Sequence, residues 1–74
     1  MFGVDREEVK RIKETYKKGT KVRLVRMNDP QAPPVGCEGT VLGVDDIGSI
    51  RVAWETGSSL SVVYGEDKVE IISA

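Results

Sequence analysis

The sequence has no histidine and a single cysteine, Cys37, and these two shortages remove much of the chemistry that proteins commonly use. Without histidine there is no Cys–His pair to activate a nucleophile. One cysteine can form neither an internal disulfide nor a cysteine-rich metal site. Acidic Glu38 follows Cys37 and does not favour a thiolate, so we interpret Cys37 as a structural thiol. With no glycine-rich phosphate loop either, we expect a protein that is not an enzyme and has no cofactor or metal.

Aromatic residues and long apolar runs are also scarce. The aromatic residues are Phe2, Tyr16, Trp54 and Tyr64, too few for much base stacking or for a conventional groove that binds proline-rich peptides. No run approaches the roughly 20 apolar residues of a membrane span, and the N-terminus shows no basic segment followed by an apolar stretch. The sequence therefore predicts a cytoplasmic location and no membrane partner.

Short segments rich in Val and Ile alternate with turn residues over most of the chain. Gly39, Gly48 and Gly57 recur every nine residues, a spacing typical of an antiparallel meander in which Gly48 and Gly57 close hairpins at positive φ. We expect strands at 21–27, 40–44, 50–54, 60–63 and 68–72, with one short helical turn at 64–67. A long loop with three prolines follows the first strand. This order predicts a mainly β fold, a small five-stranded SH3-like barrel.

The first 18 residues predict one amphipathic helix in front of this barrel. Asp5 is the expected N-cap, with Glu8 completing a capping box and Val4 packing on Val9. Gly19 is the expected stop.

A helix of this length is marginal alone in water, so its apolar stripe of Val9, Ile12 and Tyr16 must be covered. Packing against the barrel is the default, which makes 1–18 and 19–74 one domain. A helix-mediated homodimer is the alternative.

Charge is balanced in number but divided along the chain. Residues 1–27 carry nine Lys or Arg and four Asp or Glu, a net charge of +5, whereas residues 28–74 carry a net charge of −6. The favoured interpretation is that the basic segment complements the acidic barrel. The alternative is a free basic surface for nucleic acid, formed by Lys10, Lys13, Lys17, Lys21 and Arg23.

The stretch from Gly19 to Val41, with its Met-Asn-Asp-Pro-Gln-Ala-Pro-Pro and Gly-Thr-Val signals, resembles a family of small bacterial and phage domains. That family is known as domain of unknown function 4314. The resemblance also covers Val44 to Gly48 and Trp54 to Leu60, and thus spans about residues 19–72. It implies a bacterial or phage origin and no known activity. Cys37 stands where the family pattern has a small or polar residue, which again favours an incidental thiol.

Each remaining candidate site has a structural interpretation beside a functional one. Asp45 and Asp46 suggest a cation site, but we favour a role in starting the hairpin that Gly48 closes. Trp54 alternates with Ile50 and Val52, which predicts a place in the core.

A protein-interaction module is the predicted function, reached by elimination. The predicted partner-binding residues lie in the proline-rich loop and just after the fourth strand: Asp29, Pro30, Pro33, Pro34 and Tyr64. The partner would be another protein or a second copy of the chain. Nucleic acid is the alternative partner, which the acidic pI of 5.4 disfavours.

Overall fold

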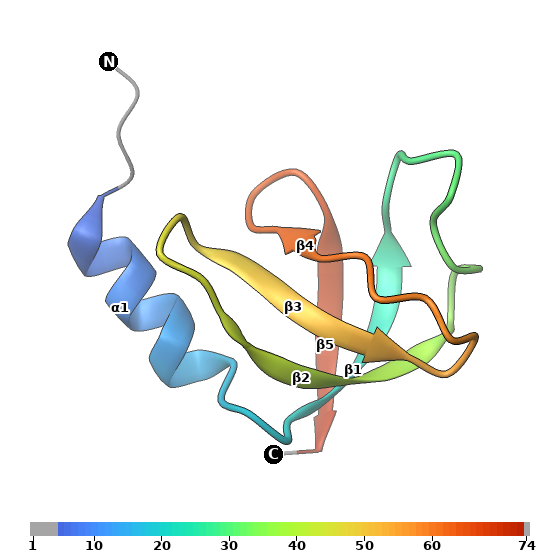
Figure 1. The fold of residues 1–74 in the computed structure, drawn as a ribbon, viewed down its shortest axis with the longest axis horizontal. Helices are drawn as coiled ribbons and strands as arrows, with labels where there is room; N and C mark the ends of the chain where they lie inside the picture. Colours follow the sequence, from blue (N-terminus) through green and yellow to red (C-terminus); the bar gives the residue numbers. More distant parts are fainter. Residues whose placement is uncertain (1–4, 74) are drawn as a thin grey trace.

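One helix packs against a five-stranded antiparallel sheet in residues 5–73, the part of the chain that the computed structural model describes (Figure 1). The elements are α1 (Arg6–Thr15), β1 (Lys21–Arg26), β2 (Glu38–Val44), β3 (Ser49–Trp54), β4 (Val62–Val63) and β5 (Lys68–Ser73). The strand order is β4-β3-β2-β1-β5, so four consecutive strands form a meander and β5 returns to pair with β1. The predicted mainly β fold with an N-terminal helix is confirmed.

The start of α1 has the predicted N-cap at Asp5, but among the described residues Glu8 does not complete the predicted capping box, because the Asp5 carboxylate bonds to Glu7 instead. The Asp5 carboxylate accepts a hydrogen bond from the Glu7 backbone N–H at 2.9 Å, which satisfies one of the donors left unpaired at the first turn. Glu7 and Glu8 lie in that turn and complement the helix dipole. The predicted partner of Val9, Val4, lies outside the described residues.

The helix ends earlier than predicted. Thr15 is its last residue, and the Tyr16 N–H still donates to the Ile12 carbonyl at 2.8 Å. Lys17 and Lys18 therefore follow the helix instead of forming its last turn. The chain leaves the helix here because the Gly19 N–H, at a φ of 94°, donates to a carbonyl of β2 at 2.8 Å.

The apolar stripe of α1 reaches the core of the sheet. Val9 and Ile12 are 7% and 5% exposed; Ile12 belongs to the main core cluster, and Tyr16 is half-buried against that cluster. The other buried members come from the strands: Val22, Leu24, Val41, Ile50, Val52, Trp54 and Val62. The predicted docking of the helix on its own sheet is confirmed, and the helix and strands share one core.

Gly48 and Gly57 have the predicted positive φ, whereas Gly39 has another role. Gly48 and Gly57 have φ of 85° and 91°, which the turns after β2 and β3 require. Gly39 instead lies inside β2, where a Cβ would be 2.6 Å from Val52 Cγ1 and 2.9 Å from Trp54 Cε3. Gly39 allows β2 and β3 to pack closely, whereas Gly48 and Gly57 allow turns. The nine-residue spacing therefore has no single physical cause.

The fourth strand is shorter than the predicted 60–63. The Leu60 carbonyl accepts the Trp54 indole N–H at 2.9 Å, and the Leu60 N–H donates to the Ser58 hydroxyl at 3.3 Å. These backbone groups are therefore unavailable for a ladder with β3. Only Val62 and Val63 pair, opposite Ile50 and Ser49.

Candidate functional site

Three exposed apolar side chains surround a hollow between α1, the turn after β2, and β4. Ile47, Val63 and Tyr64 are 67%, 42% and 51% exposed. They line a space of about 340 Å³ together with Asp5 and Glu8 of the helix. Two smaller hollows adjoin it and share Tyr64 as a wall, and Tyr16 lines both. We call this surface the Tyr64 groove, defined by Asp5, Glu8, Tyr16, Ile47, Val63 and Tyr64.

A tight turn between β4 and β5 fixes the position of Tyr64. The Val63 carbonyl accepts hydrogen bonds from the Glu66 N–H at 3.0 Å and the Asp67 N–H at 2.9 Å. The Asp67 carboxylate in turn accepts from the Val63 N–H at 2.8 Å. Gly65 has a φ of 95°, which no helical residue adopts. The predicted helical turn at 64–67 is therefore wrong, and this glycine turn presents the Tyr64 ring to solvent.

The helix supplies the other wall of the groove. Tyr16, at the C-terminal end of α1, is half-buried against the core and borders the groove. Partial burial raises the pKa of the Tyr16 hydroxyl above its ordinary value, and the nearby Tyr64 hydroxyl adds to this effect. Asp5 and Glu8 line the hollow beside Ile47 and make it acidic, whereas Arg11 lines the adjoining hollow with Glu8, Tyr16 and Tyr64.

The proline-rich loop lies apart from this groove. None of the residues 29–34 lines it, and Figure 1 shows the loop between β1 and β2 across the sheet from α1. Pro33 is buried, whereas Pro30 and Pro34 are exposed. The Asp29 carboxylate accepts the Gln31 N–H at 2.8 Å and so shapes the turn. The structure thus separates the two parts of the predicted partner site.

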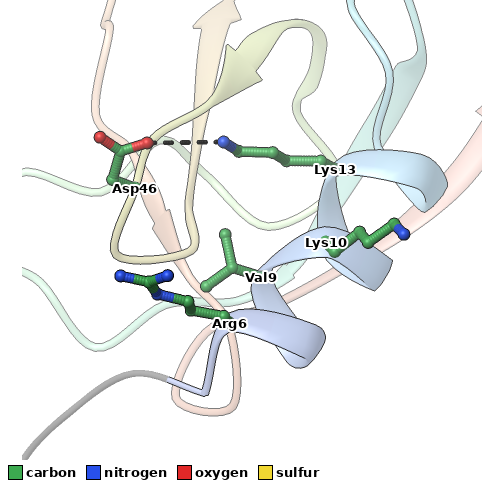
Figure 2. Close-up of a pocket in the computed structure, with 5 residues that line it drawn as sticks. All are labelled: Arg6, Val9, Lys10, Lys13 and Asp46. Atoms are coloured by element: carbon green, nitrogen blue, oxygen red, sulfur yellow. Dashed lines mark hydrogen bonds and ion pairs between the residues drawn. The ribbon is translucent and has the colours of Figure 1, made fainter.

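The five cations predicted as nucleic-acid contacts lie on different elements of the fold. Lys10 and Lys13 line a hollow of about 620 Å³ together with Arg6, Val9 and Asp46. Figure 2 shows Arg6 and Lys13 reaching toward the turn that carries Asp46, while Lys10 points away from that turn. The Lys13 Nζ lies 3.5 Å from Asp46 Oδ1, and both side chains are exposed.

The other predicted cations lie in the turn after α1 or on β1. Lys17 follows the helix and is exposed. Lys21 Nζ donates to Thr40 Oγ1 at 3.0 Å. Arg23 pairs with Glu70 at 2.8 Å and with Glu38 at 3.5 Å. The hydrogen bond to Glu70 raises the pKa of Arg23, so this cation is already neutralised by acidic partners.

The remaining candidates serve the fold. The Asp45 carboxylate accepts from the Ile47 N–H at 3.1 Å and the Ser49 N–H at 2.9 Å, so it starts the hairpin as predicted. Trp54 is 3% exposed, which confirms its place in the core. Cys37 is half-buried and packs against that core. Among residues 5–73, no three His, Cys, Asp or Glu side chains gather in a way that could hold a metal ion.

Ile47, Val63 and Arg6 are the members of these two surfaces that the sequence analysis did not single out. Ile47 carries a signal, because it is an apolar residue inside an otherwise polar turn. Arg6 precedes Lys10 and Lys13 by four and seven positions, which places the three on one flank of a helix. Val63 carries no such signal, because successive strand residues point to opposite faces and the two adjacent valines of β4 do not reveal which one faces outward.

Fold and groove together define a small mainly β domain with a docked N-terminal helix and a groove of mixed polar and apolar lining at their junction. The chain belongs to the family described as domain of unknown function (DUF4314), whose model matches residues 5–72. The match includes α1, so the helix is part of the family domain. No curated protein and no solved structure matches the chain. The SH3-like barrel and the bacterial or phage origin therefore stay predictions.

No helix among residues 5–73 is long and apolar enough to cross a membrane.

Proposed function

We propose that this domain is a non-catalytic interaction module that binds a segment of another protein in the Tyr64 groove. The observation that carries the proposal is the exposure of Ile47, Val63 and Tyr64 around one hollow. Single exposed apolar residues are ordinary, but several that border one hollow are typical of a binding surface. A tyrosine on a rigid turn is also a favourable anchor, since it loses little conformational entropy on binding.

The groove selects for the chemistry of its partner. Its walls are apolar along Val63 and Tyr64, and its Ile47 end carries the carboxylates of Asp5 and Glu8. A short segment with apolar side chains and a Lys or Arg at one end complements this arrangement. The exposed prolines of the β1–β2 loop lie elsewhere, so they are not part of the proposed contact.

A peptide selection tests the proposal. A random peptide library displayed on phage is selected against the immobilised domain, and the affinity of the recovered peptides is measured by fluorescence anisotropy. We expect peptides with apolar and basic residues, and we expect Tyr64→Ala to lower their affinity by about tenfold or more. Leu42→Ala is the matched control, because Leu42 is 43% exposed on β2 and does not line the groove. It should change the affinity less than twofold.

Two results would contradict the proposal. One is a set of peptides that bind the Tyr64 variant as well as the original domain, or that lose affinity with Pro34→Ala instead. The other is a dimer in sedimentation that Tyr64→Ala converts to monomer, which would make a second copy of the chain the occupant of the groove.

A further inference from the structure

The Tyr64 groove continues along α1 into a hollow that contains a cation. This second hollow has a volume of about 230 Å³, and Glu8, Arg11 and Tyr64 are part of its lining. In the hollow beside Ile47, by contrast, the charged lining residues are Asp5 and Glu8. The charge of the helix wall therefore changes from acidic to basic along the groove.

These three charged side chains are accessible to a ligand. Asp5, Glu8 and Arg11 are all exposed. In the part of the chain that the structure describes, the ion pairs are formed by other residues. The Asp5 carboxylate accepts one hydrogen bond, from the Glu7 N–H, and an ionised carboxylate can accept several. The helix wall therefore presents charges of both signs to a bound segment.

We propose that the partner segment in the Tyr64 groove is extended and carries one basic and one acidic side chain two positions apart, with the acidic one against Arg11. This inference rests on the proposed function and adds the acidic residue to it. Asp5 and Glu8 precede Arg11 by six and three positions, which is about 9 and 4.5 Å along a helix axis. Side chains at i and i+2 of an extended segment share a face and are about 6.6 Å apart, between these two values.

The opposite wall accounts for the apolar residues of the segment. The residue between the two charged ones points to the other face, where Ile47, Val63 and Tyr64 are exposed. A segment in which charged and apolar residues alternate therefore fits both walls. A purely basic segment would place a like charge against Arg11, and a purely apolar one would bury the charged groups of α1 without partners.

A double-mutant cycle tests the contact with Arg11. The probes are two fluorescein-labelled peptides without terminal charges, Ser-Leu-Lys-Leu-Glu-Leu-Ser and the same peptide with Gln in place of Glu, and their affinities are measured by anisotropy. We expect Arg11→Gln to weaken binding of the Glu peptide about two- to fivefold and binding of the Gln peptide less than about 1.5-fold. Lys10→Gln is the matched control, because Lys10 is exposed on the same helix and lines neither hollow. It should weaken binding of the Glu peptide less than about 1.5-fold.

Three results would overturn the inference while leaving the proposed function intact, provided that Tyr64→Ala still weakens binding of the peptides recovered from the library. One is an equal loss in Arg11→Gln and Lys10→Gln, because the overall charge of the helix would then explain both. The second is a loss in Arg11→Gln that is the same for the two probes. The third is failure of the Glu peptide to bind a domain that binds the recovered peptides. If Tyr64→Ala leaves the affinity of the recovered peptides unchanged, both the proposed function and this inference are wrong.

Discussion

Gly39 shows how one residue can be fixed by space instead of by backbone conformation. Its φ is not positive, yet a Cβ there would meet Val52 Cγ1, Trp54 Cε3 and, at 2.9 Å, the Ala53 carbonyl oxygen. The Ala53 oxygen belongs to the backbone and the other two atoms belong to core side chains, so none of the three can move aside freely. A side chain as small as a methyl group is therefore too large at this position.

We predict that Gly39→Ala lowers the free energy of unfolding by about 2–3 kcal/mol, the usual cost of overpacking a core. Gly57→Ala is the comparison, because Gly57 has open space around it and a φ of 91°. Backbone strain alone should cost about 1 kcal/mol there. Urea denaturation of the two variants decides the point. A larger cost at Gly57 would show that β2 and β3 can separate to accept the methyl group.

Tyr16 makes the stability of the domain depend on pH. Its pKa is raised in the folded protein above the ordinary 10.0, so the folded state holds this proton more tightly than the unfolded state. The contribution to stability is complete below about pH 10 and is lost as the pH rises through the raised pKa. We predict that the free energy of unfolding falls more steeply above pH 10 in the original protein than in Tyr16→Phe. Parallel curves from denaturation at pH 8 to 11 would contradict this.

At the scale of elements, α1 is the part whose stability depends most on its neighbours. It has ten residues, fewer than an isolated helix needs in water. Its contact with the sheet rests on Val9 and Ile12, which also lie closest to the position that a Cβ on Gly48 would occupy, at 3.6 and 3.4 Å. The helix therefore covers the β2–β3 hairpin as well as the core.

We predict that Ile12→Asp destabilises the domain by about 3 kcal/mol or more, because it removes a buried apolar side chain and places a carboxylate in the core. Lys10→Asp introduces the same carboxylate at an exposed position of the same helix and should cost less than about 1 kcal/mol. Thermal unfolding of both variants measures the difference. Equal melting temperatures would mean that α1 does not contribute to the stability of the sheet.

The sequence alone was enough to predict the elements that depend on residues close together in the chain. The cap at Asp5, the hairpin started by Asp45 and the glycine turns follow from residue types at fixed spacing, and the structure has all of them. The length of β4 could not be predicted in this way. It depends on the indole of Trp54 reaching the Leu60 carbonyl, a bond across six positions that no periodic pattern records.

The candidate site was predictable only in part, for the same reason. Tyr64 was identified from its place after the fourth strand, whereas Val63 belongs to the site only because it lines the same hollow as Ile47 and Glu8. Val63 is a groove residue that the sequence did not predict, whereas Pro33 is a predicted site residue that turns out to be buried. Burial of a loop residue is a tertiary property, and composition does not encode it.

At the scale of the whole molecule, ion pairs connect the two segments of opposite charge. Among residues 5–73, each ion pair joins the basic segment 1–27 to the acidic segment 28–74: Lys13 with Asp46, and Arg23 with Glu38 and Glu70. The favoured interpretation of the charge pattern therefore agrees with the structure. Exposed pairs of this kind contribute about 0–1 kcal/mol each, so they orient the segments more than they stabilise them. They use only two of the nine cations of the basic segment, Lys13 and Arg23.

The bond between the Trp54 indole and the Leu60 carbonyl has an optical consequence. Trp54 is the sole tryptophan and is 3% exposed, so its fluorescence originates from the centre of the core. Unfolding transfers this fluorophore to water and breaks its hydrogen bond, which shifts the emission to longer wavelength. Both tyrosines, in contrast, border the groove beside α1. The protein thus carries two spectrally distinct reporters without any added label, one for the core and one for the surface beside α1.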